Sequence, residues 1–351
     1  MRTARIGAAA GLAMLAAPAA AQPLVVSDSG DTAWILVASA LVLLMTIPGL
    51  ALFYGGLVRA RNVLSVIMHC FVMVCAISLL WAIIGYSLVF GEGDQWIGGT
   101  GNAFLANLAD LRADTTIPES AFALFQMTFA VITPALVIGA FVERIRFGWV
   151  VTFSLFWTLF VYVPVAHSVW GGGWLSSLGV LDFAGGIVVH TTAGIAALVV
   201  AVMLGVRKGF NKTLLPPHSP ALTMAGAGLL WVGWYGFNGG SALAASDDAA
   251  TAILNTHLAA SAAALIWIAL ERIKIGKPTS IGIVTGAVAG LATVTPAAGY
   301  IGPMGAIVLG LLGSLACFYA VLLIKQKLKI DDSLDVFAVH GVGGMLGSVL
   351  L

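Results

Sequence analysis

The sequence predicts an all-α polytopic membrane protein, arranged as an inverted repeat of five plus five transmembrane helices. Three observations support this fold class. Hydrophobic residues make up 60% of the 351 residues and charged residues only 9%, and the mean hydropathy is +1.04, which is a membrane composition. Ten apolar stretches follow one another along the chain, and short motifs recur in its two halves.

The net charge and the cysteines argue against a nucleic-acid-binding protein, a disulfide-stabilised protein and a cysteine-ligated metal site. The net charge of +1 leaves no basic field for nucleic acid. The three cysteines, Cys70, Cys75 and Cys317, lie in apolar stretches and have neither the spacing of a disulfide framework nor that of a metal site. We therefore read them as small apolar packing residues and expect no cofactor.

Residues 1–21 have the pattern of a cleaved signal peptide. Arg2 and Arg5 form the charged start, an apolar stretch follows, and Ala19 to Ala21 form a small-residue cleavage site before Gln22. Cleavage would leave a domain of residues 22–351 with its mature N-terminus outside the cytoplasm.

Most of the apolar stretches meet the roughly 20 residues that a helix needs to cross a bilayer. They are 32–57, 63–90, 120–142, 147–167, 185–206, 219–240, 249–270, 279–296, 301–324 and 335–351. With the N-terminus outside, every basic residue after position 21 except Arg112 falls in a loop on the cytoplasmic side, as the positive-inside rule requires. This pattern predicts a multi-pass membrane protein with its mature N-terminus outside the cytoplasm.

The chain reads as two related halves, about 32–206 and about 219–351. Ile132–Leu136 (ITPAL) recurs as Val294–Ala298 (VTPAA), and Phe53–Gly56 (FYGG) recurs as Phe237–Gly240 (FNGG). Five helices per half, an odd number, would insert the second half upside down, as in many transporters whose site lies near the midplane. The tenth stretch stops within an apolar run at Leu351, so we expect a C-terminally incomplete domain.

His190 and His340 stand in matching places, each on the last helix of its half. A polar group at membrane depth needs a partner, and its default interpretation is a functional site. We therefore expect the two imidazoles to line a pore between the halves, where they either relay a proton or only shape the channel.

Six sequence blocks in order resemble the Amt/Mep/Rh ammonium transporter superfamily, on the bacterial Amt side. The blocks are Thr46–Leu57 (TIPGLALFYGGL), Gly139–Phe147 (GAFVERIRF), Ala166–Gly173 (AHSVWGGG), Leu181–His190 (LDFAGGIVVH), Gly233–Ser241 (GWYGFNGGS) and Asp335–Val342 (DVFAVHGV). The resemblance implies a homotrimer with one pore per subunit that carries ammonium or ammonia, with methylammonium left open. It also implies a bacterial inner membrane, with the mature N-terminus in the periplasm. Family members have eleven helices, and we expect the eleventh to be missing here.

The resemblance also implies roles for individual residues. Trp170, Phe129 and Ser241 would form an outer binding site, and Phe129 with Phe237 a two-ring gate. An indole attracts a cation and a hydroxyl accepts an ammonium hydrogen. Asp182, the sole charge between Arg146 and Arg207, would stabilise the cation electrostatically or cap the following helix. Gln126 is a further candidate near the mouth.

Other interpretations stay open at this point. His190 and His340 could ligate a haem or a metal, which an absorption spectrum would reveal. An ammonium-sensing membrane module with little transport is the alternative function. The resemblance further implies a PII-type regulatory protein at the cytoplasmic face, docked partly on the loop with Arg144 and Arg146 and on the 325–335 loop.

Overall fold

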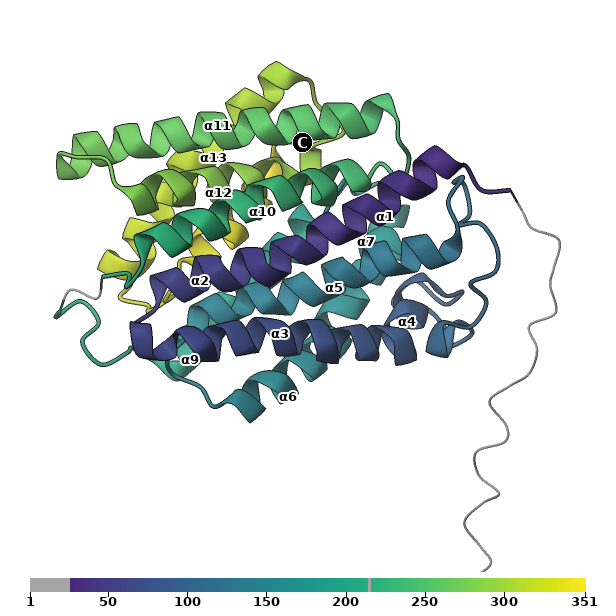
Figure 1. The fold of residues 1–351 in the computed structure, drawn as a ribbon, viewed down its shortest axis with the longest axis horizontal. Helices are drawn as coiled ribbons and strands as arrows, with labels where there is room; N and C mark the ends of the chain where they lie inside the picture. Colours follow the sequence, from purple (N-terminus) through teal and green to yellow (C-terminus); the bar gives the residue numbers. More distant parts are fainter. Residues whose placement is uncertain (1–25, 214–215) are drawn as a thin grey trace, which may run out of the picture.

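The computed structural model describes residues 26–213 and 216–351, and long helices run side by side through it (Figure 1). In this part of the chain the extended pairings are two isolated bridges, and no named strand occurs. The prediction of an all-α membrane protein is confirmed. The predicted signal peptide, residues 1–21, lies outside the described residues.

The first half is formed by helices that are often interrupted by short 3₁₀ or π-helical turns. They are α1 (Ser29–Leu44), η1 (Met45–Leu50), α2 (Ala51–Leu57), η2 (Ala60–Asn62), α3 (Val63–Leu80), η3 (Trp81–Gly85), α4 (Tyr86–Phe90), η4 (Ala103–Leu105), α5 (Glu119–Phe141), α6 (Phe147–Trp157), η5 (Thr158–Tyr162), α7 (Val163–Trp170), α8 (Trp174–Ser177), η6 (Gly186–Thr191) and α9 (Thr192–Leu204).

The second half has fewer interruptions. Its elements are α10 (Pro220–Gly240), α11 (Asp247–Ile275), α12 (Ser280–Val294), η7 (Thr295–Ala297), α13 (Pro303–Leu322), η8 (Leu323–Lys327), η9 (Phe337–Gly341) and α14 (Val342–Val349). In Figure 1, α11, α12 and α13 lie together on one side and α3 with α4 on the other. Between them α1 packs against both α10 and α5, so the two halves share one core.

Eight helices of the described residues are long and apolar enough to cross a membrane. They coincide with eight of the ten predicted stretches. The sixth stretch corresponds to α10, which has 21 residues, and the tenth to the shorter apolar helix Phe337–Val349. Ten crossings remain a prediction.

Several helices of the described chain begin at a side-chain cap. Asp28 accepts the Asp31 N–H at 2.9 Å, Thr279 accepts that of Gly282 at 2.8 Å, and Ser219 and Ser246 act similarly at α10 and α11. Such caps satisfy N–H groups that a helix leaves free in its first turn, which matters most where no water is available.

Glycine allows the two histidine-bearing helices to touch. A Cβ at Gly194, four residues after His190, would collide with the backbone of Gly341, directly after His340. A Cβ at Gly344 would lie 2.7 Å from the Cβ of His190. Close backbone approach at small residues is the usual packing of membrane helices. Here it brings positions 190 and 340 together from the two halves.

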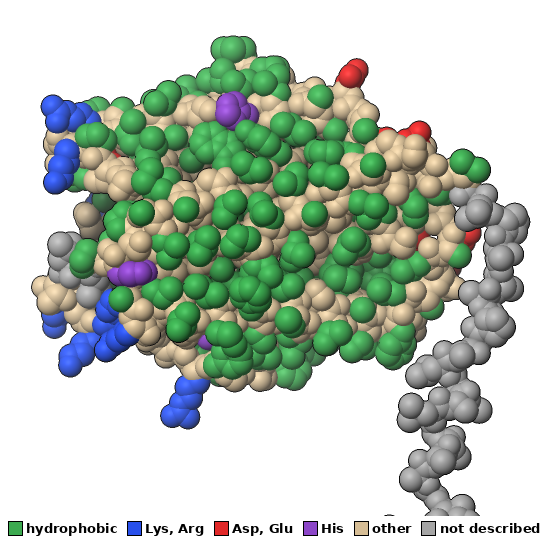
Figure 2. Space-filling view, in the orientation of Figure 1, with side chains coloured by type: hydrophobic (Ala, Val, Ile, Leu, Met, Phe, Trp, Pro, Cys, Tyr) green, Lys and Arg blue, Asp and Glu red, His purple; other side chains and the backbone are tan. Residues whose placement is uncertain are grey.

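Charged side chains gather at opposite ends of the molecule, with apolar side chains between them (Figure 2). We call these the basic end and the acidic end. The exposed basic residues include Arg61, Arg146, Lys208, Lys212, Arg272, Lys274, Lys277, Lys327 and Lys329. The large exposed hydrophobic residues, such as Phe71, Phe160 and Leu265, are suited to a lipid environment.

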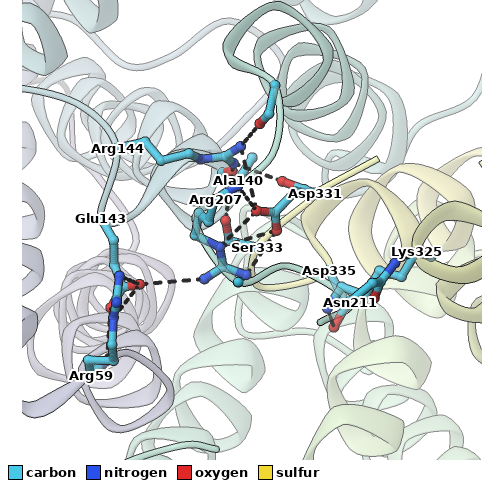
Figure 3. Close-up of polar contacts among 12 residues, drawn as sticks. Arg59, Ala140, Glu143, Arg144, Arg207, Asn211, Lys325, Asp331, Ser333 and Asp335 are labelled. Atoms are coloured by element: carbon cyan, nitrogen blue, oxygen red, sulfur yellow. Dashed lines mark hydrogen bonds and ion pairs between the residues drawn. The ribbon is translucent and has the colours of Figure 1, made fainter. Parts of the chain in front are cut away.

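Ion pairs join the loops of the two halves at the basic end (Figure 3). Arg59 contacts Glu143 at 2.6 Å, and Arg207 contacts Asp331 at 2.9 Å and Glu143 at 3.7 Å. Arg144 donates to the Asp331 carbonyl at 2.8 Å. Burial alone would raise the pKa of Glu143, but hydrogen bonds from Arg59 and Asn62 hold it at about 2. The pairs therefore fix the loop that precedes η9.

Candidate functional site

Two short π-helical elements, η6 and η9, carry His190 and His340. The two Nδ1 atoms lie 3.2 Å apart, and the rings are close to parallel, with centroids 5.2 Å apart and an angle of 22°. Both side chains are buried. In a neutral pair with this contact, one Nδ1 donates and the other accepts. The Nε2 atom of His190 finds no hydrogen-bond partner among the described residues, so one polar position of the pair remains open.

Trp234 supports the histidine pair from α10. Its indole stacks on His190 at 5.3 Å and on His340 at 6.5 Å, and its Nε1 donates to the Thr295 hydroxyl at 2.9 Å. The indole is therefore held in place at its polar edge while its face packs against both imidazoles.

Asp182 fixes the start of the helix that carries His190. Its Oδ1 accepts the N–H groups of Gly185 and Gly186 at 2.9 and 2.6 Å, and its Oδ2 accepts those of Ile187 and Val188 at 2.8 and 3.0 Å. Burial raises the pKa of Asp182, and these four donors oppose that rise. Both predicted contributions, a cap and a buried negative group, are thus compatible with its geometry.

An open pocket of about 490 Å³ lies at the acidic end, and Asp182 forms part of its wall. Trp170 lines it, with its Nε1 donating to the Asp182 carbonyl at 2.9 Å. Ser241 lines it too, and its hydroxyl donates to the Phe237 carbonyl at 2.9 Å, which leaves the oxygen free to accept. Gln126 reaches the same pocket, and its buried Oε1 has no partner in residues 26–213 and 216–351.

Phe129 and Phe237 separate this pocket from the histidines. Their rings stack with centroids 4.2 Å apart and an angle of 24°. Phe129 also meets Trp170 edge-on at 5.8 Å, whereas Phe237 lies 5.9 Å from His190. The stacked pair therefore has the open pocket on one side and the imidazoles on the other. Both rings are buried.

Two further cavities continue toward the basic end. The first is a throat of about 10 Å³, lined among others by Ile132, Phe237, His190 and His340, which is roughly the space of one water molecule. The second is an inner cavity of about 200 Å³, and it contacts His340, Lys325 and Asp335. Phe53 lines both of them.

Sequence reasoning did not single out Trp234, Phe53 or Asp332. Signals for each were present. Trp234 precedes Phe237 by one helical turn on the same face, and Phe53 is the counterpart of Phe237 in the repeated motif. Asp332 precedes His340 by eight residues, the spacing between Asp182 and His190.

In the part of the chain that the structure describes, no group of three or more His, Cys, Asp or Glu side chains is placed to hold a metal ion. An outer pocket, a ring pair, a narrow throat and an inner cavity, arranged in sequence through a helical bundle, instead define a membrane pore protein.

Comparison with known proteins makes the identification specific. The family model described as Ammonium Transporter Family matches residues 33–351. The ammonium transporter of Aquifex aeolicus is 49% identical over 327 residues, covering 92% of this chain and 76% of that protein. The one from Bacillus subtilis is 48% identical over 322 residues, covering 91% and 79%.

The comparison with solved structures leads to the same family. The crystal structure of Candida albicans Mep2 matches with a TM-score of 0.87 at 40% identity, covering 92% of this chain and 72% of that one. A structure titled Sensor Amt Protein has the same TM-score at 31% identity, covering 91% and 81%. The chain belongs to the Ammonium Transporter Family, and the prediction of an ammonium transporter rather than an enzyme is confirmed.

Proposed function

We propose that ammonium is captured in the pocket at the acidic end and gives a proton there to water in this open pocket, and that ammonia then passes Phe129, Phe237 and the two histidines to the basic end. The observation that carries this proposal is the His190–His340 contact of 3.2 Å at a throat with room for about one small molecule. The acidic end faces the periplasm of a bacterial inner membrane, and the basic end faces the cytoplasm.

To bind in the outer pocket, ammonium needs protein groups that replace the interactions it loses with its water shell. Trp170 offers an aromatic face, which attracts a cation by about 0.5–2 kcal/mol, and Ser241 and Gln126 offer oxygen acceptors. Asp182 lies in the same wall. Its carboxyl favours a positive charge nearby but does not contact it, because both of its oxygens accept N–H groups, four in all.

Passage favours the neutral form. Moving a bare ion into an apolar medium costs tens of kcal/mol, and beyond Phe237 the throat wall is mainly apolar. Ammonia avoids most of this cost. The histidine pair provides a donor and an acceptor inside the throat, so ammonia keeps a hydrogen-bond partner there and a proton has a place to move.

Assembly and regulation follow the family expectation. We propose a homotrimer with one pore per subunit, and a PII-type regulatory protein at the basic end. The second proposal is supported by the accessible Arg146 beside Arg144 and by the 325–335 loop, which lies at the mouth of the inner cavity.

The alternative of an ammonium-sensing module is favoured by one observation, the likeness to the structure titled Sensor Amt Protein. Transport remains the better proposal because the curated relatives with higher identity are named ammonium transporters.

The test uses proteoliposomes that contain the purified chain. Wild type should give a saturable ammonium response, measured as current and as a pH change in the lumen, and none with potassium. His190→Ala and His340→Ala should each change the rate or the selectivity while the protein stays folded.

A matched control is His257→Ala, which removes an exposed imidazole that contacts Tyr235 outside the pore. It should behave like wild type. Wild-type behaviour of both His190→Ala and His340→Ala would refute the proposed role of the pair, and a lack of both current and pH change in wild type would favour the sensor.

A further inference from the structure

Asp332 occupies the place in the second half that Asp182 occupies in the first. Asp182 lies eight residues before His190, and Asp332 lies eight residues before His340. Both are buried. Asp332 likewise accepts an N–H at the start of the helix with its histidine, since its Oδ2 binds the Phe337 N–H at 2.8 Å. The inverted repeat thus places one buried carboxyl toward each end of the pore.

The two carboxyls differ in how they are satisfied. Both oxygens of Asp182 accept N–H groups, four in all. The Oδ1 atom of Asp332 is buried and finds no donor within the described chain. A buried carboxylate oxygen without a donor is costly, and a proton on it removes the charge that causes the cost.

The titratable and charged groups that interact with Asp332 come from four parts of the chain. Asp335 lies in the same loop, Lys325 on η8, Arg144 after α5 and Tyr54 on α2. Lys325 Nζ is committed to Asp335 at 2.7 Å, and the Arg144 guanidinium to the Asp331 and Ala140 carbonyls and the Ser333 hydroxyl. Asp331 itself is paired with Arg207. Among the described residues, each of these cations is therefore already paired with another group, and none is paired with Asp332.

On balance, these surroundings raise the pKa of Asp332. Burial raises the pKa of Asp332 and the negative charge of Asp335 raises it further, whereas Lys325 and the backbone N–H groups of Phe337 and Val336 lower it, so that it lies at about 6. The ordinary value is 3.8. A group with such a pKa changes charge in the mildly acidic range.

We propose that Asp332 is a proton-binding site at the basic end of the pore, and that its proton sets the charge beside the inner cavity. Lys325 and Asp335 line that cavity together with His340. When Asp332 is ionised, it and this pair carry one net negative charge, which favours a cation at the inner mouth. When it is protonated, the three groups are neutral together and that attraction is lost.

The first experiment does not depend on transport. A carboxyl with a raised pKa stabilises the fold below its ordinary pKa and loses that contribution as pH rises through about 6. Asp332→Asn keeps an acceptor for the Phe337 N–H but cannot ionise. It should raise the thermal unfolding midpoint relative to wild type at pH 8 and change it much less at pH 5. Glu92→Gln, at an exposed carboxyl of the acidic end, should show no such pH dependence.

Infrared titration supplies an independent readout, which remains available if Asp332→Asn folds poorly. A protonated-carboxyl band should appear in wild type as pH falls through about 6. Asp335→Asn removes a like charge and should move that midpoint to lower pH, whereas Lys325→Gln removes an opposite charge and should move it to higher pH, each by about one unit or more. Midpoints that do not move would overturn the proposal, as would equal destabilisation by Asp332→Asn at both pH values.

The transport experiment rests on the proposed route. With equal pH on both sides of proteoliposomes, the ammonium response of wild type should fall as pH is lowered through about 6, and Asp332→Asn should lose this step. A step unchanged in Asp332→Asn would overturn the transport role. If wild type shows no transport at any pH, the route fails, while the stability and infrared results still decide whether Asp332 binds a proton.

Discussion

The rings of Phe129 and Phe237 stack at 4.2 Å and close the direct path between the outer pocket and the histidines. They come from α5 in the first half and α10 in the second. The proposed gate therefore combines one ring from each half, and the two rings differ in their other contacts.

We predict that Phe237→Ala harms transport more than Phe129→Ala. Phe237 also contacts Trp234 at 5.7 Å and His190 at 5.9 Å, so its loss removes packing from the histidine pair, whereas Phe129 contacts Phe125 and Trp170. Initial rates in proteoliposomes should fall about tenfold or more for Phe237→Ala, equivalent to roughly 1.4 kcal/mol. Equal losses would contradict the prediction.

Trp170→Leu should weaken ammonium capture without closing the pore. Removing the aromatic face loses about 0.5–2 kcal/mol of cation attraction, so the half-saturating ammonium concentration should rise roughly two- to thirtyfold. Trp170→Phe keeps an aromatic face but loses the bond to the Asp182 carbonyl, and it should lie between wild type and Trp170→Leu. Concentration series of the current measure both, and an unchanged half-saturation in Trp170→Leu would refute the role.

Gly194→Ala should separate the histidines. The new Cβ would collide with the backbone of Gly341, and the helices must move apart to accept it. We expect a folded protein with strongly reduced transport. Gly228→Ala on α10 is the control, because a Cβ there meets nothing within 4 Å. In a helix, alanine is also more favourable than glycine by about 1 kcal/mol. Comparable loss in both variants would show that helix substitution in general, and not the crossing, is responsible.

Glu143 should make the stability of the fold decrease at acidic pH. Its pKa is about 2 against an ordinary 4.5, so its stabilising contribution is present above about pH 4.5 and is lost as pH falls toward 2. Glu143→Gln should lower the thermal unfolding midpoint at pH 7 and flatten the decline below pH 4.5. If Glu143→Gln matched wild type at pH 7, the contacts with Arg59 and Asn62 would contribute nothing measurable.

The membrane fold was predictable because lipid imposes simple rules. Apolar composition and stretch length follow from the bilayer itself, and a shared place in two halves singled out His190 and His340 before any contact was known. Trp170, Ser241 and Phe237 came from family resemblance. In the structure Trp170 and Ser241 line one pocket, and the Phe237 ring lies 5.9 Å from that of His190.

The rest depends on packing that a linear pattern does not encode. Trp234 is one of 10 tryptophans, and its contact with both imidazoles arises only when α10 lies beside η6 and η9. In the sequence, nothing distinguishes Asp332 from its neighbours Asp331 and Asp335. Two structural facts together distinguish it, namely its buried carboxyl oxygen and its correspondence to Asp182.

The smallness of the throat has a consequence for the energy supply of a cell. Protons hop readily along a continuous file of water, and a membrane that lets them through loses the voltage on which its other pumps and transporters run. A space of about 10 Å³ behind two stacked rings interrupts any such file while the rings are closed. A cell could therefore hold many copies of this protein in its membrane without discharging it.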